Sequence, residues 1–107
     1  MKRYGSVIKL HPEIVDKYKE LHSTVWPNIL NMITKCNITN YSIYYKDLFL
    51  FSYYEYISED YQLDMEKMAS DPTTKEWWKL TDLCQVPLKT RAKGERWSGM
   101  EEVFHSD

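Results

Sequence analysis

Hydrophobic positions along the first quarter of the chain change from a strand-like to a helical pattern. Residues 4–10 are rich in apolar and β-branched side chains, which predicts a first strand. His11-Pro12-Glu13 then predicts a helix start, because proline suits the first helical position and an acid stabilises the first turn. Apolar residues recur at helical spacing from Ile14 to Val25, and most of the charged residues between them fall on the opposite side.

The helical pattern continues past a proline. Pro27 is expected to kink the helix or to restart it at Trp26. The apolar positions of residues 28–36 keep the helical spacing, and Asn37 is a plausible end.

Two aromatic runs predict a β-hairpin in the middle of the chain. Residues 39–46 and 48–56 are dense in aromatic and β-branched side chains, and only a short polar break at Lys46-Asp47 separates them. In the first run Tyr41 and every second residue after it share one face, because side chains alternate along a strand.

The second half of the chain predicts two further helices and a last strand. Ser58-Glu-Asp-Tyr61 is typical of a helix N-cap followed by acids, and Asp71 is expected to cap a helix with Pro72 at its first position. The predicted elements are a helix over 63–69, a helix from Pro72 to about Cys84, a loop over 89–96 and a strand over 100–105.

The order of these elements is β-α-β-β-α-(α)-β, which is the ferredoxin-like arrangement of the α+β class. The prediction is one domain over residues 1–107, with an antiparallel sheet covered by helices on one face. Tyrosine-rich strands would line the other face. Such a face is expected to be covered by a second subunit or to close over a ligand.

Charge and cysteine content narrow the classes of partner. The net charge is −2 and no Lys/Arg run is present, which argues against nucleic acid. No signal peptide pattern opens the chain, and no apolar run approaches the ~18 residues of a membrane span. Cys36 and Cys84 lie far apart, so we expect buried free thiols in a reducing compartment.

Tyr18, His22 and Trp26 are the first candidates for chemistry. Their spacing of i, i+4, i+8 places them on one face if the helix is continuous. His22 titrates nearest neutrality and can give or take a proton at working pH. The alternative is that the stripe is core and His22 a hydrogen-bonded core residue.

Other signatures of chemistry are absent from the sequence. None of the three histidines has a partner at metal-binding spacing, the three glycines are scattered, and no nucleophile elbow is present. These absences leave proton transfer on a neutral organic ligand. Two further aromatic clusters, Asn40-Tyr41 and Trp77-Trp78-Lys79, suit the apolar face and the hydroxyls of a sugar, although the Trp pair is equally suited to a core or an interface.

Several motifs in this order resemble one known family. They are Tyr18…His22…Trp26-Pro27, then Asn40-Tyr41-Ser-Ile-Tyr44, then Trp77-Trp78, then a terminal Glu-Glu-Val-Phe-His. Together, over nearly the whole chain, they resemble the L-rhamnose mutarotase family. The resemblance implies a homodimeric, cytoplasmic α/β barrel of ferredoxin-like protomers that needs no cofactor and interconverts the α and β anomers of a 6-deoxy-hexose.

The resemblance also implies roles for individual residues. His22 corresponds to the family's proton donor, and the residues that contact the sugar correspond to Tyr18, Tyr41, Trp77 and Trp78. Trp26 lies in the matching motif. His22 would give a proton to the ring oxygen first and recover it later, while the partner base stays open between Tyr18, a carboxylate and a water.

Two departures from the family concern the sugar. The hairpin break at Lys46-Asp47 is short, and the segment 85–97 is long and basic, similar to relatives associated with L-fucose. The family resemblance makes L-rhamnose the first expected substrate, and these departures add L-fucose as the second. The alternatives are a dimeric α/β-barrel monooxygenase, a non-catalytic sugar-binding dimer, and a structural dimer whose aromatic residues are all core.

Overall fold

The computed structural model describes all 107 residues as four helices, one 3-10 turn and five strands. In chain order they are β1 (Lys2–Leu10), η1 (Pro12–Ile14), α1 (Val15–Ser23), α2 (Pro27–Lys35), β2 (Ile38–Lys46), β3 (Phe49–Tyr56), α3 (Tyr61–Ser70), α4 (Pro72–Asp82), β4 (Gln85–Val86) and β5 (Ser98–Met100). No helix is long and apolar enough to cross a membrane.

The strands form one antiparallel sheet in the order β2-β3-β1-β4, with β5 also paired to β1. β4 pairs with the end of β1 at Lys9 and Leu10, and β5 pairs with its middle at Gly5 to Val7. The fourth strand of the ferredoxin-like sheet is therefore interrupted, and the segment 87–97 leaves the sheet between its two pieces. The predicted fold class is confirmed.

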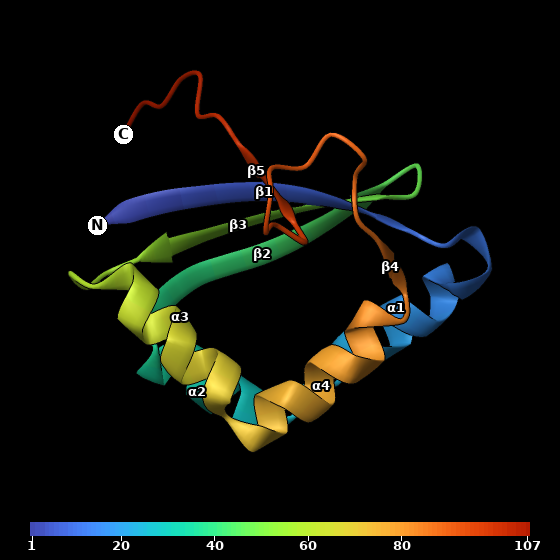
Figure 1. The fold of residues 1–107 in the computed structure, drawn as a ribbon, viewed down its shortest axis with the longest axis horizontal. Coiled ribbons are helices and arrows are strands. Elements are labelled where there is room, and N and C mark those ends of the chain that lie inside the picture. The colour runs from blue at the N-terminus through green and yellow to red at the C-terminus, as the bar shows by residue number, and fades with distance from the viewer.

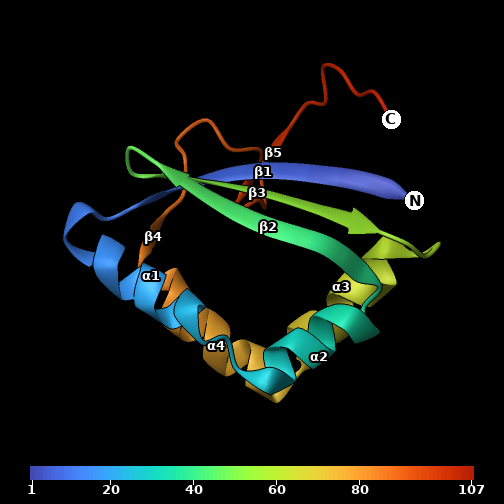
Figure 2. The same ribbon diagram turned by 180° about the vertical axis from the view of Figure 1, so that it is seen from behind.

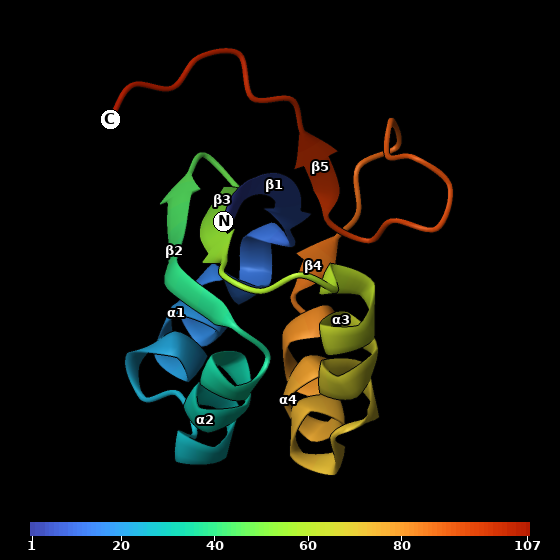
Figure 3. The same ribbon diagram turned by 90° about the vertical axis from the view of Figure 1, so that its left-hand side faces the viewer.

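All four helices lie on one side of the sheet, and the C-terminal residues run across the other side (Figures 1 and 2). Seen end-on, α1 and α2 lie beneath β2, whereas α3 and α4 lie beneath β4 (Figure 3). The space between the sheet and the two helix pairs is where inward-facing side chains of both layers meet.

The helix predicted across Pro27 is two helices. α1 ends at Ser23, and Trp26 is the extended N-cap residue of α2 with φ −58° and ψ 135°. Because a residue before proline disfavours the α-helical conformation, the chain restarts at Pro27 rather than kinking. Trp26 thus lies outside α1, and Asn37 ends the second helix region with φ 65°.

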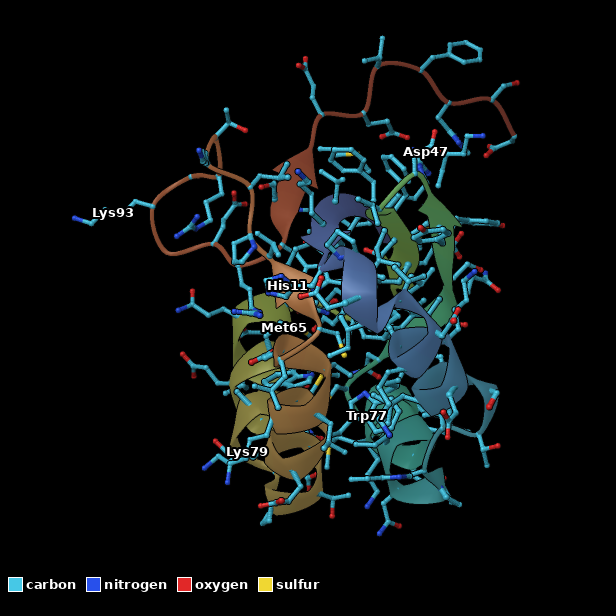
Figure 4. All side chains as sticks on the ribbon, turned by 90° about the vertical axis from the view of Figure 1, so that its right-hand side faces the viewer. His11, Asp47, Met65, Trp77, Lys79 and Lys93 are labelled. Atoms are coloured by element: carbon cyan, nitrogen blue, oxygen red, sulfur yellow. The ribbon has the colours of Figure 1, made fainter.

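Asp47 and Leu48 form the two-residue turn of the predicted hairpin, whose tip is labelled at Asp47 in Figure 4. Both residues have positive φ, 50° and 72°, as a type I′ turn requires. The tight turn fixes the pairing of β2 with β3, except at a bulge between Thr39 and Ser42.

Side-chain caps explain where the last two helices begin. Asp71 caps α4 by accepting a hydrogen bond from the backbone N–H of Thr74 at 2.9 Å, as its sequence position predicts. The cap of α3 is Asp60, which accepts from the backbone N–H of Leu63, rather than Ser58.

The predicted final strand over 100–105 is wrong. The strand is Ser98–Met100, and the residues after Met100 have no regular structure. Only a side-chain ion pair ties this tail to β1, between Arg3 Nε and Glu102 Oε1 at 2.8 Å. β4 was not predicted from the sequence, because a strand of two residues is too short to show an alternating pattern.

The hydrophobic core lies at one end of the sheet. Ile8, Leu10 and Leu50 point from the strands toward the helices and pack with Tyr18 of α1 and with Cys84. Toward the other end of the same face, the space between sheet and helices is a cavity.

Candidate active site

A cavity of about 370 Å³ lies between the sheet and all four helices. This volume falls within the range of small-ligand sites. Five of the residues singled out in the sequence line it: Tyr18, His22, Tyr41, Trp77 and Trp78. Trp26 is not among the lining residues, but its ring packs edge-on against that of Trp77 with centroids 5.1 Å apart.

Two adjacent tryptophans on α4 are placed differently. Trp77 is 6 % exposed and turns toward the interior, as Figure 4 shows, whereas Trp78 is 38 % exposed. Successive residues on a helix point about 100° apart, so one indole is fixed by packing while the other keeps an open face. Both nevertheless border the cavity.

His22 is held by α1 and by two aromatic rings. Its Nδ1 lies 2.9 Å from the backbone carbonyl oxygen of Tyr18, one helical turn earlier. Its ring stacks on the Tyr18 ring with centroids 4.2 Å apart and meets the Trp77 ring edge-on at 5.3 Å. These contacts fix both the position and the orientation of the imidazole.

The contact of Nδ1 determines where the proton of His22 lies. A carbonyl oxygen only accepts hydrogen bonds, so Nδ1 carries a hydrogen and donates it. Burial lowers the pKa of His22 from its ordinary 6.5, and the hydrogen bond to Tyr18 opposes this only in part. At neutral pH the ring is therefore mainly neutral, with the lone pair on Nε2.

Tyrosines surround the cavity with protonated phenols. Burial raises the pKa of Tyr18, and desolvation raises the pKa of Tyr41 to about 12. The Tyr41 ring packs edge-on against Tyr54, whose hydroxyl bonds to that of Tyr61. These phenols stay neutral over the working pH range and can both donate and accept hydrogen bonds.

Several polar residues that line the cavity were not predicted from the sequence. Ser6 and Ser52 stand opposite each other on β1 and β3, with their hydroxyl oxygens 2.6 Å apart. Gln85 and Arg96 also line the cavity, and Arg96 Nε donates to Gln85 Oε1 at 3.1 Å. A serine facing inward from an otherwise apolar strand was an available signal, but nothing local relates Gln85 to Arg96.

The lining side chains differ in character from element to element. The imidazole, amide and guanidinium groups come from α1, β4 and the segment 87–97. Apolar and methionine side chains come from α2, α3 and the first residue of β2: Ile29, Met32, Ile33, Ile38, Met65 and Met68. A ligand with both hydroxyls and an apolar group would match this division.

No three His, Cys, Asp or Glu side chains lie close enough together to share a metal ion. The only carboxylate that lines the cavity is Asp82, and it is paired with Arg96 at 3.2 Å. The chemistry that these residues can perform on their own is proton transfer, with the neutral His22 ring as the group that can accept a proton.

Comparisons with known proteins agree over the whole chain. A family model described as L-rhamnose mutarotase matches residues 3–106. Among curated proteins, the L-rhamnose mutarotase of Oceanobacillus iheyensis is 31% identical, and that of Lactiplantibacillus plantarum 30% identical, each alignment covering 100% of both chains.

Two solved structures share the fold. A crystal structure of an L-rhamnose mutarotase from Formosa agariphila aligns with TM-score 0.78 and 22% identity over 100% of both chains. Tetracenomycin F2 cyclase from Streptomyces glaucescens aligns with TM-score 0.66 and 15% identity, covering 99% of this chain and 96% of the cyclase.

Proposed function

The chain belongs to the L-rhamnose mutarotase family of isomerases, and we propose that its cavity interconverts the α and β anomers of a 6-deoxy-hexose, with L-rhamnose as the preferred sugar and L-fucose as the second. The observation that carries the proposal is the neutral His22, fixed by Tyr18 and Trp77 at the wall of a cavity lined by both polar and apolar side chains. Binding alone does not require a titratable group at that point.

The reaction opens the sugar ring and closes it on the other face of the anomeric carbon. Nε2 of His22 takes the proton of the anomeric hydroxyl, and the bond between the anomeric carbon and the ring oxygen breaks to give an aldehyde. The imidazolium returns the same proton to the ring oxygen. After rotation of the aldehyde, the reverse steps close the ring, so protons balance over the cycle and one acid–base group suffices.

Tyr18 supports this reaction as a hydrogen-bond donor rather than as a base. Burial raises the pKa of Tyr18, so its phenol keeps its proton at working pH. A hydrogen bond from the phenol to the ring oxygen stabilises the negative charge that develops there as the bond breaks. The sequence left the base open between Tyr18, a carboxylate and a water; in the proposed cycle His22 itself takes the first proton, so no separate base is needed.

The aromatic residues hold the sugar. Trp78, half-open to the cavity, suits the apolar face of the ring, and Tyr41 offers a hydroxyl from β2. The methionine side chains of the lining suit the C6 methyl group, which distinguishes a 6-deoxy-hexose from a hexose. Trp77 lines the cavity and also fixes the His22 ring, while Trp26, outside the lining, packs against Trp77.

Saturation-transfer NMR on the anomeric protons tests the function directly. Protein-dependent transfer between the α and β signals of L-rhamnose, faster than for L-fucose at equal concentration, is expected. His22→Asn should lose at least 100-fold of the exchange, because a positioned acid–base group contributes roughly 10²–10⁴-fold. His11→Asn is the matched control, since His11 lies at the exposed start of η1.

Two results would overturn the proposal. One is the absence of transfer with either sugar from a folded protein. The other is exchange at the wild-type rate in a folded His22→Asn variant.

We also propose that the protein is a homodimer that buries the open face of its sheet. Val7, Phe51 and Tyr44 are direct neighbours across β1, β3 and β2. They alternate with Ile8 and Leu50, which pack toward the helices, so they lie on the opposite face of the sheet. Phe51 is 37 % and Tyr44 66 % exposed, which makes an apolar row on a monomer surface. Light scattering should give twice the chain mass, and Phe51→Lys should give a monomer.

Leu83→Lys is the control for the dimer, because Leu83 is 71 % exposed at the end of α4, on the other side of the sheet. A monomeric wild-type protein, or a Phe51→Lys variant that remains dimeric, would refute this face as the interface.

The cysteines support a cytoplasmic location for this enzyme. Cys36 and Cys84 are both buried free thiols, and burial raises the pKa of each, so neither is reactive. Cell fractionation followed by immunoblotting would test the location. Recovery in a secreted or membrane fraction would contradict it.

A further inference from the structure

Asn40 stands beside Tyr41 in the sequence, but the reaction proposed above does not use it. Of the two residues, only Tyr41 lines the cavity. The side-chain amide of Asn40 instead donates from Nδ2 to Oε1 of Glu55 at 2.6 Å. The backbone of Asn40 has φ 50°, in the left-handed region that asparagine adopts more readily than most residues. What distinguishes Asn40 is therefore its backbone conformation rather than a group that could reach the sugar.

The pairing of β2 with β3 contains one extra residue at this point. Thr39 and Ser42 are three residues apart, but their partners on β3 are only two residues apart. Asn40 and Tyr41 therefore share one partner position, which is that of Tyr54. A bulge whose first residue is left-handed is a known type, normally built with glycine, and Asn40 takes that place here.

The bulge reverses which residues of β2 face the helices. Ile38, before the bulge, is 6 % exposed and lines the cavity. Side chains alternate along a regular strand, so without the extra residue Tyr41 would face the opposite side of the sheet from Ile38. Beyond the bulge, Tyr41 and Ile43 line the cavity instead. The extra residue thus turns Tyr41 inward, where its ring packs edge-on against Tyr54 with centroids 5.2 Å apart.

Glu55 holds the bulge from the outer face of the sheet. Its Oε1 accepts from Asn40, and its Oε2 accepts a hydrogen bond from the Tyr53 hydroxyl at 2.7 Å. Glu55 follows Tyr54 directly on β3, so the Asn40 side chain is tied to the residue next to the partner of the bulge.

We propose that Asn40 is a positioning residue for sugar binding, because its left-handed backbone forms the bulge that turns Tyr41 into the cavity. The hydrogen bond to Glu55 secures that conformation. The inference rests on the proposed function, in which Tyr41 offers a hydroxyl to the sugar. Asn40 does not line the cavity, so its replacement acts through the placement of Tyr41.

Asn40→Val removes the bulge, whereas Asn40→Gly keeps it. A β-branched residue is strongly disfavoured at φ 50°, but glycine adopts that angle at no steric cost. We expect Asn40→Val to raise the KM for L-rhamnose about tenfold, as Tyr41→Ala should, because a contact of the sugar is lost. The kcat should stay nearly unchanged, because His22 lies on α1 rather than on β2. Asn40→Gly should stay within about twofold of the wild-type KM.

Asp47→Val is the matched control for backbone strain. Asp47 has the same φ of 50°, but it lies at the hairpin tip and does not line the cavity (Figure 4). Asp47→Val should therefore lower the melting temperature as Asn40→Val does, but leave KM unchanged. An equal rise of KM in the two variants would mean that strain alone weakens binding, and it would overturn the proposal.

The double variant tests whether Asn40 acts through Tyr41. Asn40→Val should have no further effect on KM in the Tyr41→Ala background. Factors that multiply, an Asn40→Val protein with the wild-type KM, or an Asn40→Gly protein as weak as Asn40→Val would each overturn the proposal. Should Asn40→Val fail to fold, Asn40→Ala imposes a milder strain at the same angle and should raise KM about threefold.

A measurement that needs no activity distinguishes this inference from the reaction itself. The nuclear Overhauser effect between the rings of Tyr41 and Tyr54 should be lost in Asn40→Val and kept in Asn40→Gly. An inactive wild-type protein with this pattern would reject the reaction but not the placement of Tyr41. An active protein that keeps the ring contact in Asn40→Val would overturn the role of Asn40.

Discussion

Trp77 and Trp78 are neighbours in sequence, yet replacing each by alanine should affect different properties. Trp77 is 6 % exposed and contacts the rings of both His22 and Trp26. Trp78 is 38 % exposed and keeps one side open. We predict that Trp77→Ala chiefly lowers stability, and that Trp78→Ala chiefly weakens sugar binding.

The expected magnitudes follow from burial. Truncating a buried aromatic side chain to alanine costs about 3–5 kcal/mol of unfolding free energy. The two edge-on ring contacts of Trp77, with centroids at 5.1 and 5.3 Å, place it at the upper end. Trp78→Ala should cost below about 2 kcal/mol, and loss of its contact with the sugar should raise the dissociation constant about fivefold.

Urea denaturation followed by circular dichroism measures the first effect. With a slope of about 1–3 kcal/mol per molar urea for a chain of this size, Trp77→Ala should lower the midpoint by roughly 2 M. NMR titration with L-rhamnose measures the second effect. Equal losses of stability in the two variants, or weaker binding only in Trp77→Ala, would refute the division of roles.

Three further predictions concern His22, Leu48 and Asp71. Burial lowers the pKa of His22 below 6.5, and the proposed reaction needs the neutral form of the ring. The exchange rate should therefore be constant above about pH 6.5 and fall about tenfold per pH unit below the lowered pKa. A protein-dependent rate that rises toward acid pH would contradict this. Leu48→Gly should raise stability by about 1 kcal/mol, because a leucine at φ 72° is strained, and a lower melting temperature would count against it. Asp71→Ala should cost about 1 kcal/mol because the N-cap of α4 is lost, and unchanged denaturation would show that the cap contributes nothing.

Local signals were enough for much of the fold. The cap at Asp71 with Pro72 behind it, the stop at Asn37 and the hairpin at Asp47 each depend on residues within one turn of the chain. A sequence shows such features directly, because the side chains that create them are adjacent. These features also decide which faces of the helices and strands are turned inward.

The final strand needed information that is not local. Val103 and Phe104 have the composition of a strand, yet they are 90 % and 83 % exposed. A strand forms only where a partner edge is free, and the pairing of β5 with β1 ends at Met100 opposite Gly5. Composition therefore predicted the type of element but placed it a few residues too late.

Residues that meet only through the sheet were equally hidden in the sequence. Gln85 and Arg96 are separated by the loop that interrupts the fourth strand, and Tyr18 lies on a helix from the other half of the chain. They come together because both β4 and β5 pair with β1. Side chains that separate elements bring to one cavity have no spacing that a single sequence can show.

Electrostatics within α1 determines the direction in which the first proton moves. His22 lies in the last turn of this helix, where the helix dipole and the Tyr18 carbonyl both favour a charged imidazole. Burial against Tyr18 and Trp77 disfavours the charge and outweighs the hydrogen bond, so the pKa of His22 is lowered. In the proposed cycle, the proton-donor role that the family resemblance implies is therefore the second half, because His22 would first accept the proton that it later gives to the ring oxygen.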